Sequence, residues 1–244
     1  MAQSISVKSL ALTDINNTSA GLEFNRLAPS FKIKPVLGVD FRNGVDQKYV
    51  ALARNNPGYQ ELNHFLSDHL HHNKPFDSLA PEFKNAYVIY PFRNAPKELR
   101  NNEFVGLRAE EIPYLWLSPW KDRLSQMVIQ QPITFRNQRD FNTHRLLRAI
   151  DRNTLLSKLL KSEEGNKQDK LIAPEELMNA FAELPELLYN TQAIIDDCSV
   201  YFEFGEQYPH KNQRTYTGSA RNDFELVKKL CDDAVDKRYK DPGP

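Results

Sequence analysis

Short apolar runs separated by segments of helical spacing are the feature that most constrains the fold of this chain. One such segment follows residue 59, where Leu62, Phe65, Leu66 and Leu70 recur at helical intervals. Short strands that alternate with helices are typical of α/β domains. Six runs predict strands, at 7–12, 33–39, 49–53, 87–90, 114–117 and 127–129.

The last hundred residues follow a different pattern, in which helices predominate. Pro174 suits the first position of a helix, because proline has no N–H to leave unpaired there. A loop rich in polar residues, proline and glycine covers 205–219. Further helices are predicted around 146–150, over 184–195 and over 224–235, and the last of these is amphipathic.

Length and composition exclude several classes of protein. The 244 residues suffice to bury a core, and no run approaches the roughly eighteen apolar residues of a membrane span. The N-terminus lacks the basic and apolar regions of a secretory signal. Cys198 and Cys231 are too few for a disulfide scaffold and have no CxxC spacing. We therefore expect a cytoplasmic protein in a reducing environment, with no membrane partner.

The chain has no net charge, but its charges are unevenly distributed. Residues 131–160 contain six basic residues and two acidic ones, whereas residues 161–210 contain three lysines and eleven acidic residues. Two interpretations are open: two solvated faces that attract each other, or a basic surface that lies near nucleic acid. The residues of that basic surface would be Arg136, Arg139, Arg145 and Arg148.

Histidines gather in the segment 64–72. On a helix His69 and His71 project about 200° apart, so they cannot bind one ion together. His64, Asp68 and His72 share a helical face, which is a weak metal-site pattern because a fourth ligand is lacking. We favour the alternative, a solvated polar face with His69 in the apolar stripe.

Two aspartates, Asp14 and Asp40, end predicted parallel strands. Active sites gather at the C-terminal ends of such strands. The two carboxylates can bind a divalent cation or supply a general base, and each can equally cap the following helix or turn. The chain has no glycine-rich phosphate loop, no GxSxG motif and no Cys–His nucleophile pair.

An ordered set of motifs covers nearly the whole chain. They are SLALTD at 9–14, KPVLGVDF at 34–41, VALARNNPGYQEL at 50–62, DFNTHRLLRAI at 140–150, PEEL at 174–177, ELPELLYNTQ at 183–192, FGE at 204–206 and DFELVKKLCDDA at 223–234. In this order they resemble the N-terminal PHP domain of the alpha subunit of bacterial DNA polymerase III, a C-family replicative polymerase. No single motif would suffice.

The resemblance implies a distorted seven-stranded (β/α) PHP barrel over residues 1–200, followed by a helical extension at 201–244 that leads towards the polymerase palm. Family members carry a further strand with an HxH metal motif, and then a helix, before the strand that ends in TD. We therefore expect the barrel to be truncated at its N-terminus, without that strand and helix, and to expose a sheet edge.

The resemblance also implies a metal cleft, most of whose ligands are replaced here. The histidine after the TD aspartate is Ile15, the strand-end glutamate is Asp40, and a further histidine is Lys48. The Asp-x-His motif aligns with Pro132-Ile133-Thr134. Asp14 and Asp40 alone do not make a polynuclear site, so we expect vestigial positions without a metal or other cofactor.

The resemblance predicts a non-catalytic segment of a DNA polymerase III alpha subunit, with a structural and partner-docking role in bacterial DNA replication. The parent protein resembles a DNA-directed DNA polymerase, a nucleotidyltransferase. Expected partners are the remainder of the polymerase chain, a separate proofreading exonuclease, and DNA. The alternative is a residual metal-dependent phosphoesterase or 3′–5′ exonuclease of the PHP type, which would use Asp14 and Asp40 with His144 and a Zn, Mn or Mg ion.

Overall fold

The computed structural model describes residues 6–205 and 215–238 of the chain. The chain divides into two compact units, Met1–Phe202 and Glu203–Pro244. Within the described residues, no helix is both long and apolar enough to cross a membrane.

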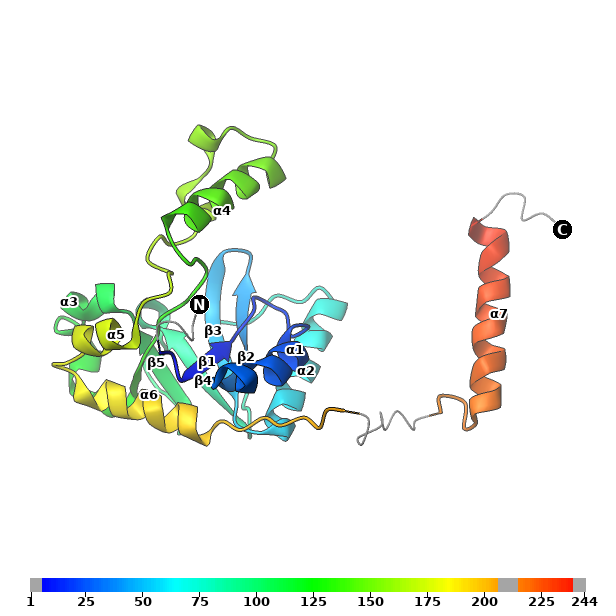
Figure 1. Cartoon of the computed structure of the whole chain (residues 1–244), viewed down its shortest axis with the longest axis horizontal. Coiled ribbons are helices and arrows are strands. Elements are labelled where there is room, and N and C mark those ends of the chain that lie inside the picture. The colour runs from blue at the N-terminus through cyan, green and yellow to red at the C-terminus, as the bar shows by residue number, and fades with distance from the viewer. Residues whose placement is uncertain (1–5, 206–214, 239–244) are drawn as a thin grey trace. The chain divides into compact units, whose positions relative to one another are not determined.

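The first unit is built on one sheet of six strands, which are neighbours in their order along the chain. Figure 1 shows helices around this sheet. β1 and β2 are parallel, β2, β3 and β4 are antiparallel, and β4, β5 and β6 are parallel. The α/β class is confirmed. In the described part of the chain β1 and β6 are the sheet edges, so the seven-stranded PHP barrel stays a prediction. The strands are β1 (Ser9–Leu12), β2 (Lys34–Asn43), β3 (Asp46–Ala53), β4 (Ala86–Pro91), β5 (Glu103–Leu107) and β6 (Met127–Ile129).

Helices and short 3₁₀ turns connect and follow the strands. α2 begins earlier than its apolar spacing predicts, because Asn55 caps it: the Asn55 side chain accepts a hydrogen bond from the Gly58 amide (2.9 Å). The α-helices are α1 (Gly21–Leu27), α2 (Asn56–His71), α3 (Ile112–Leu115), α4 (Gln138–Asp151), α5 (Pro174–Ala180), α6 (Pro185–Asp197) and α7 (Ala220–Arg238). The 3₁₀ turns are η2 (Ala28–Phe31), η3 (Phe92–Asn94), η4 (Ala109–Glu111), η5 (Pro119–Asp122), η6 (Leu124–Gln126), η7 (Leu156–Lys158) and η8 (Lys161–Glu163).

Different helices cover the two faces of the sheet. On one face, Leu37 and Val39 belong to the same buried cluster as Leu62 of α2. On the opposite face, Val36 belongs to a cluster with Ile194 of α6. Successive strand residues point to opposite faces, so covering both faces explains why β2 is buried continuously along its centre.

The structure corrects the expected position of the fifth strand. The segment 114–117, which the sequence predicts as a strand, belongs to α3 and the turn after it, with Leu115 buried and Leu117 exposed. The fifth strand is instead β5, which sequence analysis missed. The strands that lead to Asp14 and Asp40 are parallel, as predicted, and β2 then forms an antiparallel hairpin with β3.

Side chains of α6 close the β6 edge of the sheet. The Ile129 amide donates to Thr191 Oγ1 (2.8 Å). Asn190 Nδ2 donates to the carbonyl oxygens of Met127 (2.9 Å) and Leu124 (3.1 Å). These bonds occupy backbone groups that an added strand would need.

Residues 198–202, which we call the C-terminal strap, return from α6 to the first half of the unit. The Ser199 amide donates to the Arg54 carbonyl (2.7 Å). Asn25 Nδ2, which lies 175 positions away, donates to the Val200 carbonyl (2.9 Å). Asn56 binds both backbone groups of Tyr201, at 2.7 and 2.9 Å. The strap therefore joins the end of the unit to α1, α2 and β3.

The second unit contains α7, where the amphipathic helix was predicted. Asp223 accepts hydrogen bonds from the amides of Tyr216 (3.0 Å) and Thr217 (2.7 Å) near the start of the helix. Phe224, Val227 and other apolar residues of α7 are exposed. Part of the predicted loop 205–219 lies outside the described residues.

Candidate functional site

The loop after β1 is held against β2 by hydrogen bonds. The Asp40 amide donates to the Asp14 carbonyl (3.2 Å), and the Asn16 amide donates to the Asp40 carbonyl (3.0 Å). Asn16 has a φ of +48°, and its side chain binds both backbone groups of Arg42 (2.8 and 2.9 Å). Asp14 and Asp40 are therefore neighbours along the backbone of the sheet.

Asp40 lies inside β2 rather than at its end, which corrects the expected position. The strand continues to Asn43 because it forms the hairpin with β3. The Asp40 side chain is 8% exposed, and its Oδ2 accepts from Arg42 Nη2 (2.6 Å) and Nε (3.0 Å). Its Oδ1 is buried and has no partner among the described residues. One oxygen of the carboxylate thus already has a cation, the Arg42 guanidinium.

A second buried carboxylate has the same kind of partner. Asp169 Oδ1 accepts from Arg108 Nη1 (2.8 Å). Burial raises the pKa of Asp169, while Arg108 and, more weakly, Arg42 act in the opposite direction. Arg42 is therefore within electrostatic range of Asp169. We call Asp40, Arg42, Arg108 and Asp169 the guanidinium cluster.

Sequence analysis missed three members of this cluster. Asp40 and Arg42 are two positions apart in a strand and so share one face, a signal that was available in the sequence. Arg108 and Asp169 are 61 positions apart and meet only through the fold.

The residues that replace the family's ligands have other contacts. A β-bulge follows Phe41 in the hairpin and leaves Lys48 out of the strand register. Lys48 Nζ binds Asp46 Oδ2 (2.6 Å). Ile15, at another of the replaced positions, is 54% exposed. Thr134, in the segment that aligns with the Asp-x-His motif, donates its backbone amide to the Asp169 carbonyl (2.8 Å). None of these side chains offers an imidazole.

The residues present do not fit the polynuclear metal centre that the resemblance implies. The Arg42 guanidinium holds Oδ2 of Asp40, leaving few free carboxylate oxygens. In the described part of the chain, no three His, Cys, Asp or Glu side chains are grouped closely enough to hold a metal ion. Asp14, Asp40 and His144 are therefore not brought together. His144 packs beside the Phe135 ring (5.3 Å between centroids), and burial lowers its pKa.

The histidine face of α2 has contacts within its own helix and the following turn. Asp68 forms a salt bridge with Lys74 (3.0 Å), and its Oδ1 lies 3.1 Å from His72 Nδ1. The His69 ring stacks on Phe76 (4.9 Å between centroids), and its Nδ1 lies 3.0 Å from the Phe65 carbonyl oxygen. The prediction that His69 falls in the apolar stripe is confirmed.

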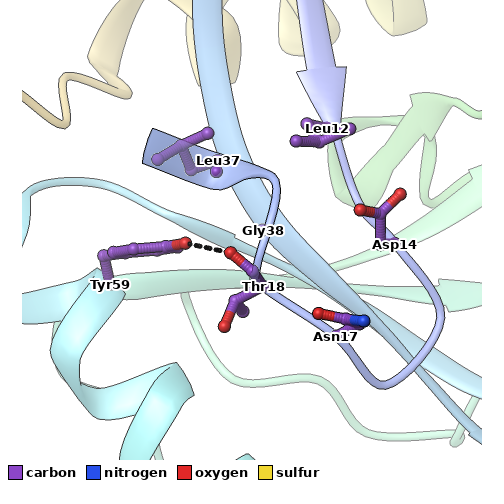
Figure 2. Close-up of a pocket in the computed structure, with 8 residues that line it drawn as sticks. Leu12, Asp14, Asn17, Thr18, Leu37, Gly38 and Tyr59 are labelled. Carbon is purple, nitrogen blue, oxygen red and sulfur yellow. Dashed lines mark hydrogen bonds between the residues drawn. The ribbon is translucent and has the colours of Figure 1, made fainter. Parts of the chain in front are cut away.

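A small pocket lies beside Asp14 (Figure 2). Tyr59 Oη donates to the Thr18 carbonyl (3.1 Å). In Figure 2 the Asp14 carboxylate and the Tyr59 hydroxyl lie on opposite sides of the pocket, so these polar groups do not converge on one point. A Cβ at Gly21 would collide with Tyr59 Oη, which explains the glycine. The pocket is lined by Leu12, Asp14, Asn17, Thr18, Gly21, Leu37, Gly38 and Tyr59.

The basic segment forms α4 and the residues around it, and most of its arginines are paired. The pair with Glu164 joins the basic segment to the acidic one, as the first interpretation of the charge pattern predicts. Among the described residues, no acidic side chain lies within salt-bridge distance of Arg139. The pairs are Arg136–Asp140 (2.6 Å), Arg145–Glu164 (2.9 Å) and Arg148–Asp151 (3.2 Å).

Comparison with known proteins finds relatives of one kind. The chain is 23% identical over 248 residues to DNA polymerase III subunit alpha of Buchnera aphidicola, and 24% identical over 249 residues to that of Escherichia coli K12. It is 22% identical over 257 residues to that of Xylella fastidiosa. These alignments cover 85 to 88% of this chain. The chain matches one part of the DNA polymerase III alpha subunit.

The alpha subunits are much longer than this chain, which spans 21 to 22% of their length. The predicted resemblance to the alpha subunit is confirmed. The names of these relatives do not mention a PHP domain, which stays a prediction. No family model matches the chain.

Proposed function

We propose that this chain is a non-catalytic, PHP-type module of a bacterial DNA polymerase III alpha subunit. It acts in DNA replication by stabilising the polymerase and docking partner proteins in the cytoplasm. The observation that carries the proposal is the similarity to alpha subunits over about 85% of the chain. The proposed partners are the remainder of the polymerase chain and a separate proofreading exonuclease.

The guanidinium cluster supports the non-catalytic part of the proposal. A hydrolytic metal ion lowers the pKa of a bound water and so generates the nucleophile. A guanidinium stays protonated and offers only N–H donors, so Arg42 and Arg108 neutralise Asp40 and Asp169 without activating water. The two guanidinium groups therefore neutralise the buried carboxylates, as a metal ion would, but they do not generate a hydroxide nucleophile.

Metal analysis and a hydrolysis assay test the non-catalytic part. We expect the purified chain to hold no stoichiometric Zn, Mn or Fe, and to leave bis(p-nitrophenyl) phosphate and the 3′ ends of single-stranded DNA intact with each metal added. Stoichiometric metal that is lost on Asp14→Ala and kept on Asp122→Ala, a matched change at an exposed acidic residue, would overturn it.

Sedimentation of mixtures tests the docking part. We expect the chain to form a stoichiometric complex with the remainder of the alpha subunit, or with the proofreading exonuclease, from the same organism. If the chain sediments alone in both mixtures, the docking role is refuted, whatever the metal analysis shows.

A residual phosphoesterase or 3′–5′ exonuclease is the second candidate, and one observation favours it. Oδ1 of Asp40 is buried without a partner among the described residues, and such an atom can accept a ligand. This candidate would use Asp14 and Asp40 with Zn, Mn or Mg, and it would need further ligands, because His144 does not lie with them in the described structure. The metal analysis above separates it from the leading proposal.

DNA is a further proposed partner, through the arginines of α4. Arg139 is the one of the four candidates for which the described residues include no salt-bridge partner. We expect binding of single- or double-stranded DNA that weakens with salt and is lost on Arg139→Glu, whereas Arg26→Glu, in α1, leaves it unchanged. Binding that is absent or insensitive to salt refutes this contact.

A further inference from the structure

Residues 136–168, which contain α4 and the turns after it, form an arm with its own small core. Phe141 and Ala149, the buried residues of α4, belong to none of the three buried clusters that include strand residues. Phe141 packs instead against Phe135 at the base of the arm (5.3 Å between ring centroids). Figure 1 shows α4 (green) away from α2 and α6, the helices that cover the sheet. One face of α4 is therefore turned into the arm, and the sheet does not cover the opposite face.

This opposite face of α4 is apolar along its C-terminal half. Leu146, Leu147 and Ile150 are 51%, 59% and 66% exposed. Arg139 and Thr143 precede them at steps of three and four residues, so the five side chains follow one line along the helix. We call these five residues the outer α4 stripe. Apolar side chains at this spacing are the anchors through which two helices pack lengthwise.

The charges of the arm are unbalanced, and its acidic residues are already paired. The arm contains eight basic and four acidic residues, a net charge of +4. Arg139, Lys158 and Lys167 have no salt-bridge partner among the described residues, so an incoming surface meets cations that are free and carboxylates that are not. The paired acids are Asp140 with Arg136, Asp151 with Arg148, Glu163 with Arg152 and Glu164 with Arg145.

We propose that the outer α4 stripe docks an acidic amphipathic helix of a partner protein. Leu146, Leu147 and Ile150 offer apolar area to the apolar face of such a helix, and the free cations attract carboxylates beside that face. A second copy of this chain is a poorer occupant, because two arms of net charge +4 repel each other. The inference rests on the docking part of the proposed function and deepens it by naming the chemistry of the partner.

Nucleic acid and anionic membranes are also attracted by cations, but they fit the stripe less well. Contacts to phosphate use cations and hydrogen-bond donors, and they leave the three apolar side chains of the stripe without a role. A helix that binds a membrane surface lies at the interface with its polar face in water. The face of α4 opposite the stripe is instead packed inside the arm, through Phe141 and Ala149.

Fluorescence anisotropy with a synthetic peptide tests the site in the full chain. The probe is a labelled helical peptide of about 18 residues, or about five turns, with leucines at helical spacing and glutamates beside them. A peptide of the same composition in scrambled order is its control. We expect the chain to bind the first peptide and not the second. Absence of binding, or equal binding of the scrambled peptide, overturns the proposal.

Variants of the stripe show where the peptide binds. Leu147→Ser is expected to weaken binding by roughly ten-fold or more, as the loss of an apolar anchor does. Ile150→Glu is expected to weaken it more than Ile150→Lys, because only the glutamate repels an acidic partner. Leu117→Ser, at a leucine that is 88% exposed after α3, is the matched control and leaves binding unchanged. Equal binding by Leu147→Ser and the wild type, or an equal loss in Leu117→Ser, overturns the proposal. Circular dichroism verifies that each variant is folded.

The same variants separate the other ligands and the docking role. Single-stranded DNA that binds Leu147→Ser as tightly as the wild type, without peptide binding, assigns the stripe to nucleic acid and overturns the proposal. Binding of vesicles of phosphatidylserine and phosphatidylcholine without peptide binding overturns it as well. A complex with the polymerase remainder or the exonuclease that forms without peptide binding refutes this inference and leaves the docking role intact. Peptide binding by a chain that sediments alone in both mixtures supports the stripe and refutes those two partners.

Discussion

Replacing Arg42 by alanine is expected to destabilise the first unit strongly, because it leaves the Asp40 carboxylate buried without a cation. Arg42 donates two hydrogen bonds to Oδ2 (2.6 and 3.0 Å), and Oδ1 has no partner among the described residues. Removing one partner of a buried ion pair costs about 3–5 kcal/mol. Because 22% of the Arg42 side chain is exposed, we expect the lower limit, about 3 kcal/mol. In a unit of this size that corresponds to a Tm lower by about 6–12 °C.

Urea unfolding followed by circular dichroism measures this change. Lys48→Ala, on the adjacent strand, is the matched control, because its partner Asp46 is 54% exposed and such a pair contributes about 1 kcal/mol or less. Adding Asp40→Asn to Arg42→Ala removes the buried charge and is expected to restore part of the lost stability. A loss of less than about 1 kcal/mol for Arg42→Ala, or no recovery in the double variant, would refute the reasoning.

Three further changes test other parts of the first unit. Arg54 and Tyr87 hold the pKa of Asp197 below its usual 3.8, so its contribution to stability is present above about pH 4 and lost as the pH falls further. The difference in unfolding free energy between the wild type and Asp197→Asn is therefore expected to shrink below pH 4, and a difference that is constant with pH contradicts this. Asn190→Ala uncovers the β6 edge and is expected to lower stability by about 1–2 kcal/mol and to speed aggregation in light scattering; unchanged scattering contradicts it. Gly165 has a φ of +75°, so Gly165→Ala is expected to lower stability by about 1 kcal/mol in thermal unfolding, and an unchanged Tm contradicts this.

The spacing of apolar residues predicted most helices and strands. It failed where a short apolar run fits either a buried strand or a short helix. Residues 114–117 are apolar, as a buried strand would be, but Pro113 lies in the first turn of α3 and Leu117 is 88% exposed. β5 was missed because Glu103 opens it and Gly106 interrupts its apolar pattern. Glu103 is buried there because Arg100 binds it (2.8 Å), a contact that no periodicity reveals.

The candidate site was predicted only in part, for a similar reason. Residue types showed that Ile15 and Lys48 cannot serve as histidine ligands, and the structure adds what surrounds the remaining carboxylates. The Arg108–Asp169 pair joins the end of β5 to a segment 61 positions later, so it depends on the sheet order. The position of Asp40 inside β2 depends on the hairpin, which apolar spacing does not distinguish from a parallel strand.

The C-terminal strap has a consequence for how the chain folds as it is made. Three residues of the first half of the unit bind the strap, so their hydrogen bonds can form only after the strap has been synthesised. The pairs are Asn25–Val200, Arg54–Ser199 and Asn56–Tyr201. At about 5–20 residues per second, synthesis through residue 202 takes about 10–40 s. Throughout that time the nascent chain lacks the segment that joins α6 to α1 and α2. The first unit can therefore be completed only after residues 198–202 have been synthesised, and a ribosome that stalls before residue 198 would leave α1, α2 and β3 without the strap.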